Sequence, residues 1–249
     1  RAIKASTFKG SKNHSLTVMT PAGRLGRVVC MGLGKAKDLD ALAFQDLGGR
    51  VVGNLKAHAT TAQVLVDDLE GCLLKAHEIA AEMALGAKLG SYTFDKYKTK
   101  KKDHDRPKLN EVKLFCKTSI KAKALYEPKD KIADGVFFTR DLVSEPANVL
   151  YPATLAEQAK SLAKMGIKVE VLSLAQMKRL GMGALIGVAQ GSVHEPKLVI
   201  MHYTGKPTRG AKSAKADQPV AFVGKGVTFD SGGISIKPSG GMEDMKWEM

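Results

Sequence analysis

Three charged side chains follow one another closely near the end of the sequence, in a stretch rich in glycine. Lys225, Asp230 and Lys237 lie within the segment GKGVTFDSGGISIKPS. The apolar run PVAFVG at 219–224 leads into Lys225 and is typical of a strand buried on both faces of a sheet. Ligands of open α/β sheets collect at the carboxyl ends of the strands. One carboxylate and two lysines at such a place predict a polar binding or catalytic site.

Glycine-rich segments also occur as plain surface turns and as nucleotide-binding loops. A Gly-Lys-Gly tripeptide is, by itself, more often a surface turn. The P-loop spacing is absent, because Gly226 rather than serine or threonine follows Lys225. Gly181 and Gly183 lack the third glycine and the preceding strand of a dinucleotide fingerprint. A turn and a catalytic segment stay open as alternatives.

Several motifs in one order resemble the leucyl aminopeptidase family, also called the cytosol aminopeptidases. The segment 224–238 resembles that family's catalytic signature, and RDLVSEPAN at 140–148 resembles its entry into the catalytic domain. LGMGA at 180–184 and QGS at 190–192 resemble its next blocks, and AEMALGA at 81–87 with GSY at 90–92 resembles its N-terminal domain. The resemblance spans roughly residues 75–249, and several independent motifs make chance a poor explanation.

The resemblance implies a two-metal exopeptidase that releases N-terminal residues, leucine among them, by water attack. It implies that Lys225 and Asp230 are metal ligands, and that Lys237 is the catalytic ammonium that stabilises the oxyanion. Lys225 can coordinate only as a neutral amine. Two divalent ions drawn from Zn, Mn, Co or Mg are the expected cofactors, since nitrogen and oxygen donors suit all of these metals. Peptides with a free N-terminus are the expected substrates.

The last few residues depart from the family pattern. Glu248 stands in the segment Lys246-Trp247-Glu248-Met249, where the family usually has aspartate as its next ligand. Glu248 keeps the charge and adds a methylene, so it is a third candidate ligand. The family's further Asp-x-Glu ligand pair and catalytic arginine are absent from this sequence. Three ligands hold two metals poorly, so we expect this chain alone to have little or no peptidase activity.

The helices and strands that would position these residues are predicted to form two α/β domains. Residues 1–125 are expected to form an N-terminal domain with a mixed sheet, and 126–249 the first part of a catalytic domain with a mostly parallel sheet. In the first, strands are expected within 15–34 and at 62–68 and 111–116, helices at 36–57 and 72–89, and a solvated loop at 91–110. In the second, helices are expected at 129–143, 154–165 and 174–180, and strands at 167–172, 197–203 and 219–224, with a loop at 205–217. Thr154 is expected to cap the helix that Gly166 ends.

Composition places the chain among globular proteins of a reducing compartment. Of 249 residues, 44% are hydrophobic and 26% are charged, which disfavours disorder. Three well-separated cysteines in apolar surroundings indicate buried thiols rather than a disulfide framework or zinc knuckle. No apolar run reaches the length of a membrane span, and no secretory signal is visible. A cytoplasmic protein without a membrane partner is expected.

The net charge of +14 favours anionic partners. Five lysines fall within 96–102, and Tyr92, Phe94 and Tyr97 lie among or beside them, a composition that suits nucleic acid as well as a solvated loop. Some bacterial members of the resembled family bind DNA, and members assemble as hexamers, so DNA binding and, for the full-length protein, a homo-hexamer are further expectations. The alternative function is a non-catalytic relative or fragment that acts as a nucleic-acid-binding or structural subunit.

Overall fold

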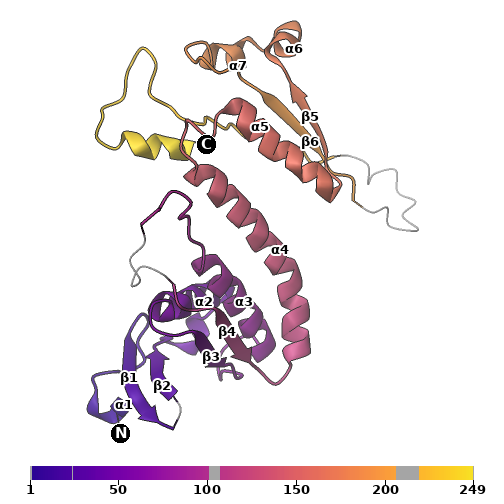
Figure 1. Cartoon of the computed structure of the whole chain (residues 1–249). Helices are drawn as coiled ribbons and strands as arrows, with labels where there is room; N and C mark the ends of the chain where they lie inside the picture. Colours follow the sequence, from indigo (N-terminus) through magenta and orange to yellow (C-terminus); the bar gives the residue numbers. More distant parts are fainter. Residues whose placement is uncertain (1, 24, 101–106, 206–218, 249) are drawn as a thin grey trace, which may run out of the picture. The chain divides into compact units, whose positions relative to one another are not determined.

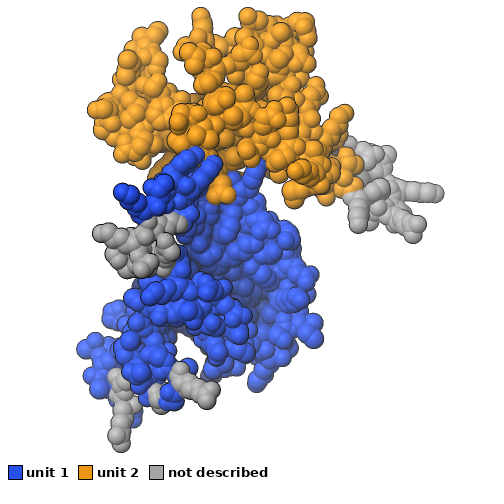
Figure 2. Space-filling model, viewed as in Figure 1, with its two compact units in different colours: residues 1–138 blue, residues 139–249 orange. Residues whose placement is uncertain are grey.

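The computed structural model describes residues 2–23, 25–100, 107–205 and 219–248. The chain divides into two compact units, residues 1–138 and 139–249, which are coloured separately in Figure 2. The division falls inside one helix, α4 (Ser119–Ser144), and the domain boundary expected at 125 lies in the same helix. Each unit is described by itself below.

Unit 1 combines a hairpin with a strand–helix–strand motif (Figure 1). The short N-terminal helix α1 (Ala2–Ala5) precedes an antiparallel hairpin of β1 (Ser15–Ala22) and β2 (Leu25–Met31). The short 3-10 helix η1 (Ala36–Asp38) and α2 (Ala41–Leu55) follow, and Asp40 caps α2 by accepting a hydrogen bond from the amide of Ala43. β3 (Thr61–Leu65) and β4 (Glu111–Phe115) are parallel, and α3 (Ala76–Gly90) lies on the connection between them. A parallel pair requires such a crossover.

The core of unit 1 lies between α2, α3 and one face of the parallel strands. It contains Phe44, Leu47, Val51, Ala62, Val66, Ala76, Ile79, Ala80 and Met83. Along β4 the burial alternates, with Val112 and Leu114 half-buried between exposed neighbours, as its period-two sequence predicts. The helices α2 and α3 cross closely because glycines face backbone where they meet. A Cβ added to Gly90 would lie 2.8 Å from the Cα of Gly49.

Most of the elements expected in unit 1 are confirmed, and several boundaries differ. α2 begins at Ala41, after the separate turn η1, and β3 ends at Leu65 instead of 68. Residues 72–75 precede α3 instead of belonging to it, because the carboxylate of Asp68 caps the helix at the amide of Ala76. α4 begins ten residues earlier than the expected start at 129, and it contains Pro128. Residues 91–100 form the expected loop without helix or strand, and 101–106 lie outside the described residues.

Unit 2 contains the end of α4, a pair of strands with short helices before and between them in the sequence, and a long irregular segment. α5 (Pro152–Ser161) and the 3-10 helix η3 (Leu162–Met165) end at Gly166, which has a positive φ of 84° as predicted. β5 (Lys168–Leu172) pairs antiparallel with β6 (Leu198–His202), and α6 (Leu174–Arg179) and α7 (Gly183–Val188) lie between them in sequence. The segment 219–248 ends in the 3-10 helix η4 (Met242–Glu248). The mixed α/β class expected from the sequence is confirmed.

Three expectations for unit 2 differ from the described structure. A mostly parallel sheet was expected, whereas the described strands β5 and β6 pair antiparallel. Thr154 is not the cap of α5: Tyr151 is, and Thr154 accepts a hydrogen bond from its amide at 2.9 Å. Within the described residues 219–248 the chain forms no strand, although 219–224 has the composition of one. A strand buried on both faces needs neighbours on both sides, and the described part of unit 2 offers it none. Much of the expected loop at 205–217 lies outside the described residues.

Candidate functional site

The segment 224–237 brings Asp230 and Lys237 together. Lys237 Nζ lies 3.3 Å from Asp230 Oδ2, and the amide of Gly232 donates to Asp230 Oδ1 at 2.9 Å. The amide of Lys237 also donates to the carbonyl of Ser231 at 3.0 Å, which closes the loop between the two charged residues. Asp230 and Lys237 are therefore positioned by a single hydrogen-bonded turn.

Gly232 is required for this turn. Its φ of 101° is strained for residues with a side chain, and an added Cβ would come within 2.9 Å of the amide nitrogen of Lys237. The glycine in the sequence motif is thus explained by the close approach of the backbone on which Lys237 sits. This close approach favours a built loop over the plain surface turn that a Gly-Lys-Gly sequence also allows.

The electrostatics of the turn keep Asp230 ionised. The hydrogen bond from the Gly232 amide and then that from the Lys237 ammonium hold the pKa of Asp230 below its usual value, and the charges of Lys237 and Lys225 act in the same direction. The side chains of Asp230 and Lys237 are 40% and 31% exposed, so the pair is open to solvent and to a ligand. Lys225 thus acts on Asp230 through its charge, while Lys237 touches it.

The donor chemistry fits part of a divalent-metal shell. An ionised carboxylate is the form that a metal binds, and each oxygen of Asp230 keeps a lone pair beyond the hydrogen bonds described. Lys225 could add a nitrogen donor once neutral. The backbone of Glu248 lies in η4, and its side chain falls outside what the structure describes. In the described part of the chain, no three His, Cys, Asp or Glu side chains cluster in a way that could hold a metal. The ligand roles of Lys225, Asp230 and Glu248 stay predictions.

One contact of this turn, and the burial of a lysine in η4, were not expected from the sequence. Lys237 Nζ lies 2.9 Å from the sulfur of Met245, which adds a second contact to the lysine. Lys246 is buried, at 8% exposure, and its burial lowers its pKa while the charge of Glu145 opposes that change. Neither the contact of Met245 nor the burial of Lys246 could be predicted from the sequence, because both depend on the path of η4.

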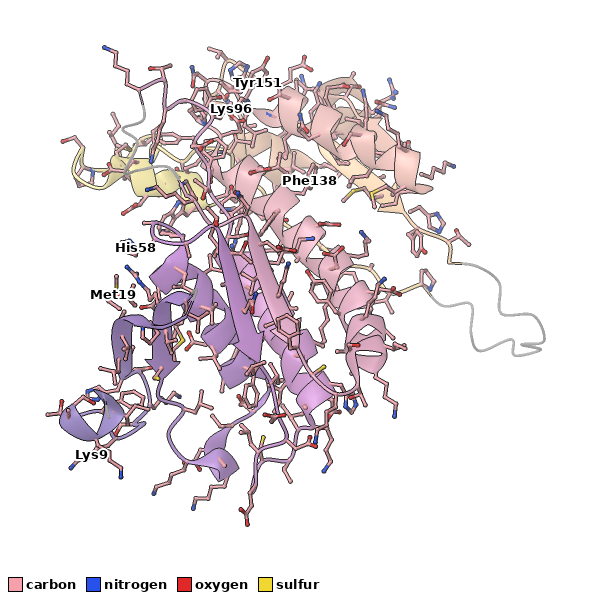
Figure 3. All side chains as sticks on the ribbon, turned by 60° about the horizontal axis from the view of Figure 1, so that its bottom comes forward. Lys9, Met19, His58, Lys96, Phe138 and Tyr151 are labelled. Carbon is pink, nitrogen blue, oxygen red and sulfur yellow. The ribbon has the colours of Figure 1, made fainter. Side chains whose placement is uncertain are left out.

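The lysine-rich loop after α3 carries aromatic side chains close to its charges. Lys96 Nζ lies 5.4 Å above the ring of Tyr97, and the rings of Phe94 and Tyr97 are 6.0 Å apart. Lys96 is labelled in Figure 3, and Lys98 and Lys100 are exposed on the same loop. The lysines at 101 and 102 lie outside the described residues. Among the described residues, none of the helices is long and apolar enough to cross a lipid bilayer.

Two sequence models of one family match the chain in order. The model of the N-terminal domain of the cytosol aminopeptidase family matches residues 1–101, and that of its catalytic domain matches residues 137–249. A "Probable cytosol aminopeptidase" of Methylobacterium radiotolerans is 46% identical over 100% of this chain and 48% of its own length. One of Afipia carboxidovorans is 44% identical, with the same coverage. The chain thus spans about half the length of the curated relatives it matches.

Solved structures agree with this assignment. The bottromycin maturation enzyme BotP in complex with Mn superposes with a TM-score of 0.79 at 30% identity, covering 98% of this chain and 49% of that one. A mutant of tomato leucine aminopeptidase superposes with a TM-score of 0.70 at 27% identity, covering 80% of this chain and 40% of that one. The family signatures, the order of the two matched domains and the shared fold lead to one conclusion: this chain belongs to the cytosol aminopeptidase family.

Proposed function

We propose that this chain supplies the N-terminal domain and the first part of the catalytic domain of a metal-dependent aminopeptidase. The enzyme would release N-terminal residues, leucine among them, from peptides. The observation that carries the proposal is the Asp230–Lys237 pair, held by one glycine-dependent turn inside the region matched by the family's catalytic model. A carboxylate that binds metal and an ammonium beside it are the two charges that such a hydrolysis requires.

The candidate site residues would have different roles in the reaction. Asp230, Lys225 and Glu248 would hold the metal ions, with Zn, Mn, Co or Mg as candidates. When bound, such ions supply an activated water and a Lewis acid. Lys237 keeps its ammonium 3.3 Å from Asp230, where it would donate a hydrogen bond to the carbonyl oxygen of the scissile bond. The turn through Gly232 fixes that ammonium before substrate arrives, so little reorganisation accompanies the reaction.

We propose further that the chain alone is inactive. Three candidate ligands leave two ions short of donors. The segment beside the site also exposes apolar side chains to solvent: Phe222 and Val223 are 94% and 97% exposed, and Ile236 is 79% exposed. Large apolar side chains exposed to this degree are typical of a surface that another part of a protein covers. A complementing polypeptide would add ligands and cover this segment at once.

Complementation tests the proposal. The chain is mixed with the separately produced second half of the Methylobacterium radiotolerans relative, and hydrolysis of leucyl p-nitroanilide is followed with added Mn²⁺. We expect background rates from either half alone and a clear gain from the mixture, which Asp230→Asn and Lys237→Met abolish. Asp244→Asn, an exposed aspartate of η4, is the matched control and keeps the gain. Equal gains from all variants would refute the assigned site, and hydrolysis by the chain alone would refute its inactivity.

Metal binding gives a second readout that does not depend on turnover. Titration calorimetry with Mn²⁺ is expected to show binding to the complemented protein that Asp230→Asn weakens at least about tenfold, because one charged ligand is lost. Asp244→Asn leaves the affinity unchanged. Unchanged affinity in Asp230→Asn would remove Asp230 from the metal shell, whatever the peptidase assay gives.

A second function is favoured by the loop that follows α3. Its exposed lysines stand beside aromatic rings, an arrangement that suits single-stranded nucleic acid. We propose that this loop binds DNA or RNA through phosphate contacts and base stacking. Fluorescence anisotropy with a labelled oligonucleotide should show binding that falls steeply with salt and that Lys98→Glu with Lys100→Glu removes. Lys160→Glu with Lys164→Glu, on α5 and η3, controls for net charge, and equal loss in both pairs would contradict a local site.

The remaining expectations concern place and assembly. Cys30, Cys72 and Cys116 are free thiols, which supports a reducing, cytoplasmic location for the whole protein. We propose that the complemented protein assembles as a homo-hexamer, as the resemblance implies. Mass photometry of the complemented mixture would test this, and a mass corresponding to a single complemented pair would contradict it.

A further inference from the structure

A cavity in unit 1 is lined by none of the residues of the proposed catalytic turn. Its volume is about 590 Å³, and its lining consists of Asp67, Asp68, Lys75, Ala76, His77, Lys117 and Thr118. Asp67 and Lys117 each come two residues after the end of a parallel strand, β3 and β4 respectively. The cavity is therefore at the carboxyl ends of the parallel pair, where open α/β sheets bind small ligands. Its volume falls in the range of about 300–1,000 Å³ that is usual for such sites.

The charges of the lining balance. Two carboxylates and two ammonium groups face the same space, and His77 adds an imidazole ring. Asp67, Lys75 and Lys117 are exposed, so their charged ends can reach a ligand. A lining that offers both signs complements a molecule that carries both signs, whereas a simple ion would meet repulsion from one of the pairs.

The N-terminal end of α3, where a phosphate could bind, is already hydrogen-bonded to carboxylates of the protein itself. The amide of Ala76, in the first turn of α3, donates to Asp68 Oδ1 at 2.8 Å, and the amide of Lys75 donates to Glu78 Oε2 at 2.8 Å. These internal carboxylates satisfy the helix end that would otherwise attract an anion. Asp67 adds a further negative charge beside them. A phosphate group is thus disfavoured, and a bare cation is disfavoured by Lys75 and Lys117.

We propose that this cavity binds a zwitterionic amino acid, or a short peptide with both ends free. The ligand's ammonium lies beside Asp67 and its carboxylate between Lys75 and Lys117, with the hydroxyl of Thr118 as an additional partner. Such molecules are the products and substrates of the proposed peptidase, so the cavity would let the N-terminal unit sense them. That biological meaning rests on the proposed function, while the binding itself rests on the cavity alone.

Binding is measured by titration calorimetry on the full chain in EDTA, which keeps metal-dependent amine binding out of the catalytic segment. The probes are L-leucine and leucyl-glycine. Leucinamide, which lacks the carboxylate, and 4-methylpentanoate, which lacks the amine, are the matched partial ligands, and inorganic phosphate is the anion control. We expect leucine or the dipeptide to bind at least about tenfold more tightly than either partial ligand, because each lost ion pair costs about that factor. The relative strength of leucine and leucyl-glycine distinguishes the free amino acid from the peptide.

Variants locate the binding. Asp67→Asn and Lys117→Met are each expected to weaken it about tenfold. Glu70→Gln, an acid of the same loop outside the lining, and Lys113→Met, an exposed lysine of β4, should leave it unchanged. Asp68 is kept because it caps α3, and thermal melting of each variant without ligand confirms that folding is preserved. Lys237→Met separates the two sites, since it should abolish the complemented peptidase gain and spare this binding.

Three outcomes would overturn the inference. These are the absence of leucine and dipeptide binding at millimolar concentrations, phosphate binding in preference to leucine, and equal loss in Asp67→Asn and Glu70→Gln. Failure of the peptidase proposal is recorded by a different assay, on a different segment. If hydrolysis fails while leucine binding shows the expected variant pattern, the cavity inference stands without the catalytic one.

Discussion

Gly86 lies in α3 where α2 passes very closely. We expect a single methyl group added at this position to lower the stability of unit 1. An added Cβ would lie 2.7 Å from the Cα of Gln45 on α2 and would press still more closely on that residue's carbonyl oxygen. Carbon atoms in contact are normally about 3.5–4.0 Å apart, so α2 and α3 would have to separate by about 1 Å. The obstructing atoms are backbone, and no side chain can rotate out of the way.

The magnitude follows from two opposing contributions. Alanine favours helix over glycine by about 1 kcal/mol, which acts in favour of Gly86→Ala. Overpacking of a close-packed contact costs about 1–3 kcal/mol, and the upper end applies where backbone meets backbone. We therefore expect Gly86→Ala to lower the free energy of unfolding of unit 1 by about 2 kcal/mol.

Gly53 provides the matched control. It lies in α2, and an added Cβ there would meet nothing within 4 Å. Gly53→Ala should therefore raise stability by about 0.5–1 kcal/mol, since only the helix preference changes. Far-UV circular dichroism during urea unfolding measures both variants. Equal stabilisation by the two substitutions would show that α2 and α3 do not cross at Gly86, and the packing described for unit 1 would be refuted.

Three further predictions concern α4 and its attachment to α3. Lys88→Met removes the ammonium that pairs with Asp130 at 2.6 Å, and it should cost about 1 kcal/mol in urea unfolding after allowance for solvent screening, with a smaller loss for the more exposed Lys131→Met. The same pair holds the pKa of Asp130 at about 2, below its ordinary 3.8, so its stabilisation is present above about pH 4 and is lost as the pH falls towards 2. An acid titration of stability should lose part of its slope in this range in Lys88→Met, and an unchanged slope would contradict the pairing. Pro128→Ala should stabilise the chain by about 1–3 kcal/mol, because it restores an amide able to bond to the carbonyl of Ala124, and a lower melting temperature would count against a continuous α4.

The sequence predicted elements well where local pattern and packing agree. The alternation of 111–115 and the Ala- and Leu-rich composition of α3 sufficed, because each matches one face to a nearby core. The start of α4 was missed because Pro128 is normally a sign that a helix has not yet begun. At α5 the Thr-x-x-Glu pattern suggested Thr154 as the cap, whereas the structure uses Tyr151 followed by proline. Both errors come from reading a local signal that a longer or shifted helix overrides.

The candidate site was also predicted only in part from the sequence. The types and order of Lys225, Asp230 and Lys237 could be read from the sequence, which left a surface turn and a catalytic segment open as alternatives. That Lys237 bends back onto Asp230 depends on the turn closed by its own amide, which no spacing rule specifies. The apolar run at 219–224 failed as a strand prediction for a related reason. Strand formation depends on partners, and composition alone cannot supply them.

That same run has a practical consequence for anyone purifying the protein. Residues 219–223 carry no charge, and Val220, Phe222 and Val223 present their side chains to water. Short uncharged stretches with high strand preference join readily with copies of themselves, and charged or covering neighbours normally prevent this. Concentrated solutions of this chain should therefore precipitate through residues 219–223, and placing a lysine at position 222 should raise the concentration at which the protein stays clear.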